Sequence, residues 1–472
     1  MDASSWAANL WAAGLLVVVA TTVKAAAAEP VAVAIDAGGT LNTHADQVGV
    51  WINSTDGGLT PGLVTGLKSL GVRSIRYGWG FGRYDAVDRS GMDLVPRDPR
   101  VERYGVRDGR VSETLSPADL DRLLAELDAV GFGVVSTDGI NYTGDTDADW
   151  AALSPEQRLD SLATAAADWA TQSPGLTHFE IGNENDIAGR KDDSVIKPWT
   201  AAGYAHVVAK MIDTVKAARP RARCGFNGGL LDEAGSRVWF EQLARAEPSL
   251  ADRADFLVAH KYEFWLTPEV WAEHADWAFG RLPAFTREAR DRHFPKLPIQ
   301  VTELGAFKMG RNRSHVRAVL QTEMLGNVYQ DAAVEHVQVW PSTWGDEGGV
   351  LANAETGELS SLGLGMAAYA RHAQPVLCDN GSAGSIRYFA GRSLPGEPAA
   401  LTVWLVNHAA SAVDVALTIE TAADGLPAST TACVALVEEG GQTRLAAQPA
   451  ATRGGGPLPV TVPGTAVLVL RW

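Results

Sequence analysis

Two carboxylates, each near the end of an apolar strand-like run, are the residues of this sequence best suited to chemistry. Glu184 follows the run Thr177–Ile181 and a Gly-Asn pair, and Glu303 closes the run that begins at Ile299. Carboxylates are seldom buried unless they are paired or needed there. Two carboxyl groups held close together supply a proton donor and a nucleophile, which are the groups that cleave a glycosidic bond. We therefore take Glu184 and Glu303 as candidate catalytic residues.

These carboxylates need a scaffold that brings distant strand ends together, and the sequence predicts one, an α/β fold of the (β/α)8 TIM barrel type. From Val31 onward, apolar runs alternate with amphipathic helical stretches, which is the pattern of parallel βα units. The loops after the strands are long, and active sites of such barrels lie on that face. The strands are expected at Val31–Ile35, Val72–Tyr77, Gly133–Ser136, Thr177–Ile181, Ala222–Phe226, Phe256–Ala259, Ile299–Thr302 and His336–Val339.

The residue pattern changes near residue 373, where short runs of alternating apolar and polar residues are separated by turns rich in Gly, Pro and Ala. This pattern predicts a C-terminal antiparallel β-sandwich of about 100 residues. A chain of 472 residues has room for a barrel of about 250 to 400 residues and one small domain. We expect a secretion signal over residues 1–28, the barrel over 29–372 and the sandwich over 373–472.

The N-terminal apolar run Leu10–Val23 is followed by small residues before Glu29, which is typical of a secretory signal peptide. An uncleaved anchor is the alternative, because the segment before this run contains Asp2 and no Lys or Arg. No later stretch approaches the ~20 apolar residues of a membrane span. The net charge of −16 argues against a nucleic-acid partner, which would require clustered Lys and Arg. We expect a secreted or extracytoplasmic protein.

Cysteines and acidic clusters offer little evidence of further chemistry. Cys378 and Cys433 both fall in the sandwich segment and either pair or stay buried as small hydrophobic residues, whereas Cys224 is expected to be a buried thiol in a barrel strand. The acidic run Asp145–Asp149 has the spacing of a calcium loop, but Trp150 stands where such a loop needs Gly. We predict no metal and no cofactor.

Gly182-Asn183-Glu184 after the fourth strand and Thr302-Glu303 at the seventh resemble the motifs of the clan A glycoside hydrolases. The resemblance covers the whole chain, since families 39, 51 and 79 of that clan also join a (β/α)8 barrel to a C-terminal β-sandwich. It implies a retaining glycosidase with Glu184 as acid/base and Glu303 as nucleophile. In such an enzyme the two carboxyl groups lie ~5–5.5 Å apart, Glu303 is ionised and Glu184, the more desolvated or the more carboxylate-facing of the two, is protonated.

Two further residues fall where the same clan places groups that support the carboxylates. Asn183 can donate an amide hydrogen bond to a sugar 2-hydroxyl, or shape its loop through an Asx-turn. Arg76 is expected to hold Glu303 in its ionised form by lowering the pKa of that carboxyl. A structural ion pair inside the barrel is the alternative for Arg76.

Three more candidates follow the sixth and eighth strands. The resemblance implies that Tyr262 donates a hydrogen bond to the nucleophile and that His260 lines the sugar subsite; a framework histidine is the alternative for His260. Trp344 is expected to form an apolar floor against a sugar ring, with Trp340 as its competitor.

The substrate is a carbohydrate in each interpretation that we consider. Arabinofuranosides or xylosides of plant type come first, and a uronic-acid-directed, heparanase-like activity comes second, because the net charge of −16 disfavours a sulfated substrate. A catalytically silent sugar-binding protein is the rival from a different class. That rival predicts the loss of one strand-end carboxylate, and this sequence has both.

Overall fold

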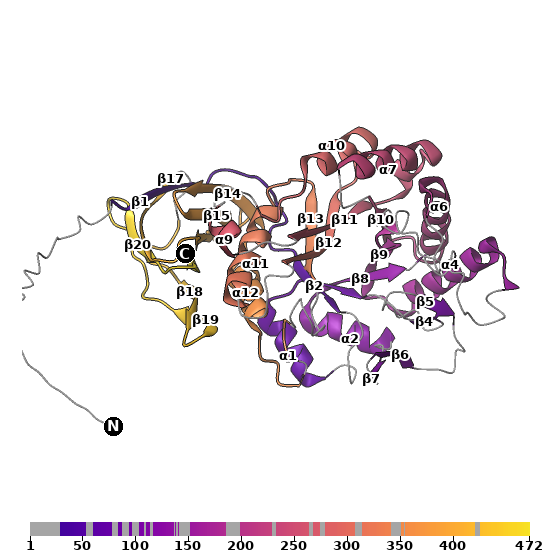
Figure 1. The fold of residues 1–472 in the computed structure, drawn as a ribbon, viewed down its shortest axis with the longest axis horizontal. Coiled ribbons are helices and arrows are strands. Elements are labelled where there is room, and N and C mark those ends of the chain that lie inside the picture. Colours follow the sequence, from indigo (N-terminus) through magenta and orange to yellow (C-terminus); the bar gives the residue numbers. More distant parts are fainter. Residues whose placement is uncertain are drawn as a thin grey trace, which may run out of the picture.

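The protein consists of a barrel and a sandwich that lie side by side (Figure 1). The computed structural model describes residues 29–52, 60–77, 84–86, 94–96, 103–107, 110–113, 117–135, 137, 140, 152–185, 199–228, 233–263, 268–273, 279–306, 314–340, 351–353, 355–420 and 425–472. The expected signal (residues 1–28), the acidic run Asp145–Asp149 and Trp344 lie outside these residues, so the expectations about them stay predictions.

Eight parallel strands close into a barrel, which confirms the predicted (β/α)8 fold. Nearly all their residues are buried, because the helices cover the outside and side chains fill the interior. In barrel order the strands are β2 (Val48–Ile52), β3 (Ser74–Tyr77), β8 (Val130–Val135), β9 (Leu176–Ile181), β10 (Arg223–Asn227), β11 (Phe256–Glu263), β12 (Ile299–Ala306) and β13 (Val334–Val339).

The expected first strand of the barrel is wrong. The run that begins at Val31 forms β1 (Val31–Asp36), which pairs in parallel with β17 (Val413–Glu420) of the sandwich. Burial alternates along β1, as in a strand with one solvated face, whereas every residue of β2 is buried. Residues 31–36 therefore belong to the sandwich and not to the barrel segment expected from residue 29. The barrel still has eight strands, because β2 takes the expected place of β1. β9 and β12 are therefore the fourth and seventh barrel strands, as expected.

Side-chain caps start two of the barrel helices, α1 and α4. Thr60 accepts a hydrogen bond from the Leu63 amide at the start of α1, and Ser154 forms a reciprocal capping box with Gln157 at the start of α4. Within the described residues, no helix combines the length and apolarity needed to cross a membrane. The helices are α1 (Pro61–Leu70), α2 (Pro117–Leu127), α4 (Pro155–Gln172), α6 (Ala201–Ala218), α7 (Glu233–Ala246), α8 (Leu250–Arg253), α9 (Pro268–Glu273), α10 (Ala284–His293), α11 (Ser314–Val328) and α12 (Ser361–Ala370).

The long connection between β3 and α2 carries two hairpins, β4 (Tyr84–Ala86) with β5 (Leu94–Pro96) and β6 (Arg103–Arg107) with β7 (Arg110–Glu113). It leaves the C-terminal end of β3, on the face where the barrel carries strand-end chemistry. These hairpins agree with the sequence-based expectation of long loops after the strands.

The sandwich is made of two sheets, and its larger sheet is shared between two cores. On one strand, Trp404 packs into the core of the barrel helices, whereas the neighbouring Val403 and Leu405 face the smaller sheet. The larger sheet is β14 (Val376–Ala383), β15 (Ile386–Arg392), β16 (Leu401–Asn407), β21 (Ala466–Arg471), β18 (Ala432–Glu439) and β19 (Gln442–Ala447). The smaller sheet is β1, β17 and β20 (Leu458–Val462).

Buried polar side chains join the barrel to the sandwich. Trp271 of α9 donates its indole N–H to Glu323 of α11 at 2.7 Å. The His408 ring, from the end of β16, stacks on Trp271 with centroids 4.0 Å apart and lies 3.1 Å from the Glu323 carboxylate. Asn42 donates to the carbonyl oxygens of Asp331 and Val334, both at 2.9 Å, where the chain passes from sandwich to barrel. Because these groups are buried and hydrogen-bonded, they fix one relative placement of the two parts.

All three cysteines carry buried free thiols. Cys378 and Cys433 lie in the sandwich core and do not form a disulfide, and Cys224 lies inside β10 as expected. Burial raises the pKa of Cys224 and of Cys378 to about 12. These thiols therefore act as small core residues and not as nucleophiles.

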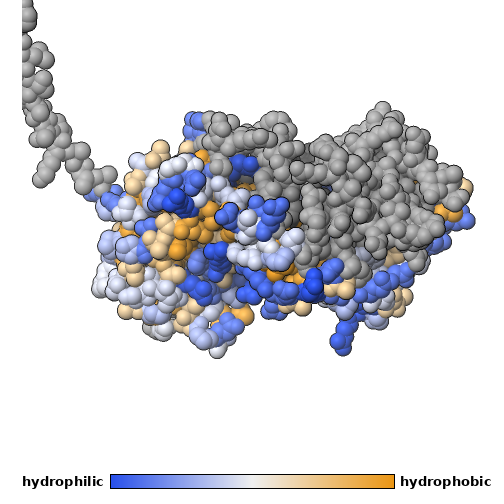
Figure 2. Space-filling view, turned by 90° about the horizontal axis from the view of Figure 1, so that it is seen from below, coloured by the Kyte–Doolittle hydropathy of each residue, from blue (hydrophilic) through white to orange (hydrophobic). Residues whose placement is uncertain are grey.

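The described surface is predominantly polar. Figure 2 shows hydrophilic residues spread over most of the coloured face, with apolar residues gathered in one area of the sandwich half. Among the described large hydrophobic side chains, those that are exposed are Leu41, Val238 and Leu394.

Two histidines lie inside the N-terminal end of the barrel, away from the strand-end carboxylates. His178 stacks on Phe132 with centroids 4.3 Å apart, and its ring lies 5.7 Å from that of His336. Burial, together with the charge of Arg223, lowers the pKa of His178 to about 2 and that of His336 to about 3. Both imidazoles are therefore neutral in the folded protein at physiological pH.

The depressed pKa values predict that His178 and His336 destabilise the fold in mild acid. The unfolded chain binds protons at these histidines below about pH 6.5, whereas the folded barrel does not, so stability is lost as pH falls below that value. Between about pH 7 and pH 5, each histidine costs on the order of 2 kcal/mol of unfolding free energy. Urea unfolding across this range measures the slope, and His336→Gln should reduce it. An unchanged slope in that variant would contradict the assignment.

Candidate active site

The turn after β9 holds Glu184 in an unusual backbone conformation. Gly182 has φ = 84°, and a Cβ atom at that position would lie 2.0 Å from the Asn185 side-chain oxygen. Glu184 itself has φ = 51°, a left-handed conformation that costs a non-glycine residue roughly 1–3 kcal/mol. Asn185, fully buried, donates to the Thr137 hydroxyl at 2.7 Å and anchors the turn. Such strain persists where the surroundings enforce it, and here it aims Glu184 across the barrel mouth.

A β-bulge sets the direction of Glu303. Ala259 of β11 pairs with Val301 of β12, but the next pair is His260 with Glu303, so Thr302 is the extra residue. The bulge puts Glu303 directly beside His260. Tyr262, two residues further along β11, donates its hydroxyl to Glu303.

Arg76 of β3 is a fully buried cation at the centre of the site. Its Nε and Nη2 donate to the two oxygens of Glu180 at 2.8 and 2.7 Å, and Nη1 donates to Glu303 at 2.7 Å. Nη2 also donates to the Asn183 side-chain oxygen at 2.9 Å, and the guanidinium lies 4.5 Å from the centre of the Trp51 ring. Because the side-chain oxygen of Asn183 faces Arg76, the N–H groups of the Asn183 side-chain amide point away from Arg76.

The two expected catalytic carboxylates meet at the mouth of the barrel. Oxygens of Glu184 and Glu303 lie within 4.8 Å of each other and of a ring nitrogen of His260. His260 Nδ1 lies 2.9 Å from Glu184 and 3.4 Å from Glu303. The Glu184 side chain is 25% exposed and that of Glu303 is 5% exposed, so of the two expected alternatives for Glu184 the greater desolvation is wrong. Glu184 does face the carboxylate of Glu303.

Burial dominates the electrostatics of Glu303. It raises the pKa of this carboxyl to about 7, with the charges of Glu184 and Glu180 adding to the effect, although His260 and Arg76 lower it. The expected lowering by Arg76 is therefore present but is not the net result. Burial alone would lower the pKa of His260, but the carboxylates of Glu303, Glu180 and Glu184 raise it to about 10. His260 is thus an imidazolium that bridges the carboxylates at neutral pH.

Glu184, His260 and Glu303 are close enough together to satisfy the distances of a metal site. Glu303, however, already accepts hydrogen bonds from Arg76 and Tyr262, and a divalent ion would stand against the Arg76 guanidinium. We assign no metal here, and the sequence-based prediction of a reaction without metal or cofactor stays a prediction.

Aromatic side chains flank the carboxylates. The ring of the half-buried Trp340, at the end of β13, lies 6.1 Å from that of Tyr262 and 5.8 Å from that of Trp51. The structure thus places Trp340, the competitor of Trp344 for the apolar floor, beside the site. Trp344 belongs to residues 341–350, which are not described, and its role stays a prediction.

Two residues of the site were missed by sequence reasoning. Glu180 is a fully buried carboxylate inside β9. It lies two residues after His178, so both side chains are on the strand face that points into the barrel. A charged residue at an inward position of an apolar strand requires a buried cation, and that signal identifies it. Trp51 was missed because its strand, β2, was not expected.

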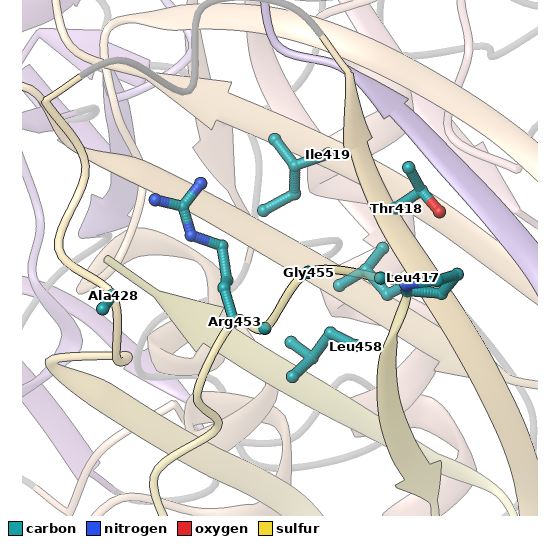
Figure 3. A pocket seen from close by; sticks show the side chains of 10 residues that line it. Leu417, Thr418, Ile419, Ala428, Arg453, Gly455 and Leu458 are labelled. Atoms are coloured by element: carbon teal, nitrogen blue, oxygen red, sulfur yellow. The ribbon is translucent and has the colours of Figure 1, made fainter.

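A separate cavity of about 570 Å³ lies in the sandwich, between β17, β20 and the loop at Gly455 (Figure 3). Apolar side chains such as Leu417, Ile419 and Leu458 line it, and Arg453 is its one charged lining residue. It contains no carboxylate, so the barrel mouth is the candidate active site.

Solved structures similar to this chain include glycoside hydrolases. The α-L-arabinofuranosidase of Thermotoga maritima, crystallised with arabinose, superposes with a TM-score of 0.65 at 14% identity, over 94% of this chain and 99% of that one. A bifunctional glucanase-xylanase from a metagenome library has a TM-score of 0.64 at 12% identity, and the match covers 94% of this chain and 99% of that one. A family 30 xylanase from Clostridium acetobutylicum has a TM-score of 0.61 at 14% identity, and the match covers 93% of this chain and 98% of that one.

These similarities establish that the chain has the fold of clan A glycoside hydrolases, including family 51. No family model matches the sequence, and the search of curated proteins found no match.

Gly182→Ala tests whether the turn needs a residue without a side chain. The added Cβ would collide with Asn185 in a left-handed conformation, so we expect a loss of at least about 1 kcal/mol of unfolding free energy. Gly133→Ala in β8 is the control, because its nearest neighbour would be an ordinary contact at 3.5 Å. Thermal unfolding of both variants measures the difference, and equal melting temperatures would contradict this role of Gly182.

Proposed function

We propose that the protein is a retaining glycosidase in which Glu303 is the nucleophile and Glu184 the acid/base. The observation that carries the proposal is the pair of strand-end carboxylates within 4.8 Å, one held by Arg76 and Tyr262 and the other more open to solvent. Double displacement requires carboxyl groups ~5–5.5 Å apart, whereas inversion requires ~6.5 Å or more. The fold shared with xylanases and arabinofuranosidases adds support.

The division of roles follows from the hydrogen bonds of each carboxylate. Glu303 accepts from Arg76 and Tyr262, so its oxygens are held as acceptors and favour the ionised form that attacks the anomeric carbon. The reacting form carries a proton on Glu184, so as that bond forms, the bond to the leaving oxygen breaks and Glu184 gives the leaving oxygen this proton. The 25% exposure of Glu184 suits a group that must meet both the leaving group and water.

The second step reverses these transfers. Glu184, now ionised, takes a proton from a water molecule, whose oxygen attacks the anomeric carbon. The bond to Glu303 breaks and the carboxylate is regenerated, so two displacements at one carbon give net retention. Asn183 can donate its amide N–H to the sugar 2-hydroxyl because its oxygen is already occupied by Arg76.

Neutral pentose glycosides, arabinofuranosides or xylosides, are the proposed substrates. A uronic acid would need a cation to receive its carboxylate. Arg76 and His260, the cations that the described residues place beside the catalytic pair, are already engaged by three glutamates. Trp340 offers an aromatic plane for the apolar face of a sugar ring. The silent sugar-binding alternative is not favoured, because both carboxylates and their hydrogen-bond partners are in place.

Single substitutions separate the two roles. Glu184→Ala should lose about 10²–10⁴-fold of its rate on glycosides with poor leaving groups but much less on an activated aryl glycoside, which departs without a proton. Azide should rescue its turnover, since the anion replaces the activated water. Glu303→Ala should be inactive on both substrates, because no covalent intermediate can form.

Steady-state kinetics on aryl arabinofuranosides, xylosides, glucuronides and galactosides would measure these effects and identify the sugar. Trapping with a fluorinated glycoside and peptide mapping should label Glu303. A label on Glu184, or equal behaviour of the two variants on activated substrates, would refute the assignment. Binding of oligosaccharides without hydrolysis of any substrate would instead favour the sugar-binding protein.

The pKa of Glu303 predicts an unusual pH dependence. The nucleophile must be ionised, and burial raises its pKa to about 7, so kcat/KM should fall as pH drops through about 7. The pH–rate profile of the wild-type protein measures this acidic limb. A limb near the ordinary glutamate value of about 4.3 would show that Arg76 and His260 outweigh burial.

A further inference from the structure

Glu180 is fully buried, and it makes more hydrogen bonds with Arg76 than Glu303 does. Its two oxygens accept from Nε and Nη2 of the guanidinium, while Glu303 accepts from Nη1 alone. The side chains of Glu180 and Arg76 are both fully buried. A bidentate pair of this kind fixes the plane of the guanidinium, and thereby the direction of the N–H group that reaches Glu303.

The pair also sets the charge that Glu303 experiences. An unpaired Arg76 at 2.7 Å would strongly stabilise the Glu303 carboxylate and make it a weak base. With Glu180 attached, the two side chains together carry no net charge. The other groups that face Glu303 are Glu184 from the β9 turn and His260 and Tyr262 from β11.

We propose that Glu180 is a positioning residue that offsets the charge of Arg76 and so keeps Glu303 basic enough to attack the anomeric carbon. The inference rests on the proposed role of Glu303 as nucleophile. The charge of Glu180 is among the influences that raise the pKa of Glu303, which agrees with this role. Arg76 then aligns the nucleophile through one hydrogen bond without suppressing its reactivity.

The two chemical steps respond in opposite directions to the basicity of Glu303. A less basic carboxylate attacks the sugar more slowly in the first step but leaves it more readily in the second. Glu180→Gln keeps the size of the side chain and removes its charge. The variant should therefore lose about 10-fold or more of its rate on substrates with poor leaving groups, where attack is limiting. On activated aryl glycosides, where the second step is limiting, it should turn over at least as fast as the wild type.

Carbon-13 NMR of the glutamate carboxyl groups provides a readout that does not depend on activity. The Glu303 signal is assigned by its absence in Glu303→Gln, and its titration should move to lower pH in Glu180→Gln. Glu180→Asp retains the charge and should titrate close to the wild type. Asn183→Asp adds a charge against the same Nη2 atom, 2.9 Å away, and should raise the pKa of Glu303. This last variant tests the proposal even if Glu180→Gln does not fold.

Glu335→Gln is the matched control. Glu335 pairs with Arg223 at 2.9 Å at the opposite end of the barrel, so its loss should change neither the Glu303 titration nor either rate. Equal titrations of Glu303 in wild type, Glu180→Gln and Asn183→Asp would overturn the inference, as would equal slowing of both steps in Glu180→Gln. If the wild type hydrolyses no glycoside, the proposed function fails, while the titrations still decide whether Glu180 sets the charge at Glu303.

Discussion

A cation without access to water is the constraint on which this site depends. Arg76 lies inside the barrel with no exposed surface, and a buried charge costs several kcal/mol unless it is paired with good geometry. Glu180 and Glu303 provide that pairing from two other strands, and Trp51 covers the guanidinium from a third. Arg76 lies on β3 and its partners lie on β2, β9 and β12. The closed barrel and the ion network therefore stabilise each other.

Closing the barrel does not by itself direct Glu184 and Glu303 toward each other. The strained turn at Glu184 and the bulge at Thr302 each break the regular pattern of a strand end, and together they turn the two carboxylates toward one space. Local irregularity of this kind is tolerated because Tyr204, buried in α6, donates to the Ile181 carbonyl and accepts from the Asn227 amide. The ends of β9 and β10 are thereby tied together directly below the Glu184 turn.

The sequence was sufficient to predict the architecture and to select polar residues that lie together at the barrel mouth, because strand-end carboxylates and alternating elements are local patterns. Arg76, Asn183, Glu184, His260, Tyr262 and Glu303 all meet in the structure. The first barrel strand could not be identified, because β1 and β2 are both short apolar runs and differ in which partner they find far along the chain. The net pKa of Glu303 was likewise out of reach, since it depends on burial and on Glu180, which only the folded barrel reveals.

The sandwich is part of the same folded unit as the site. β1 lies in the sandwich, and the chain then passes through the whole barrel and returns to the sandwich, so the three-stranded smaller sheet cannot form from the C-terminal segment alone. Trp404 belongs to the barrel core, and Trp271, Glu323 and His408 share a buried contact across the boundary. Trp271 lies in α9, between the β11 strand that ends beyond Tyr262 and the helix α10. Separating the two parts would expose the face of the larger sheet that carries Trp404, together with the barrel side chains packed against it, so the barrel and the sandwich stabilise each other.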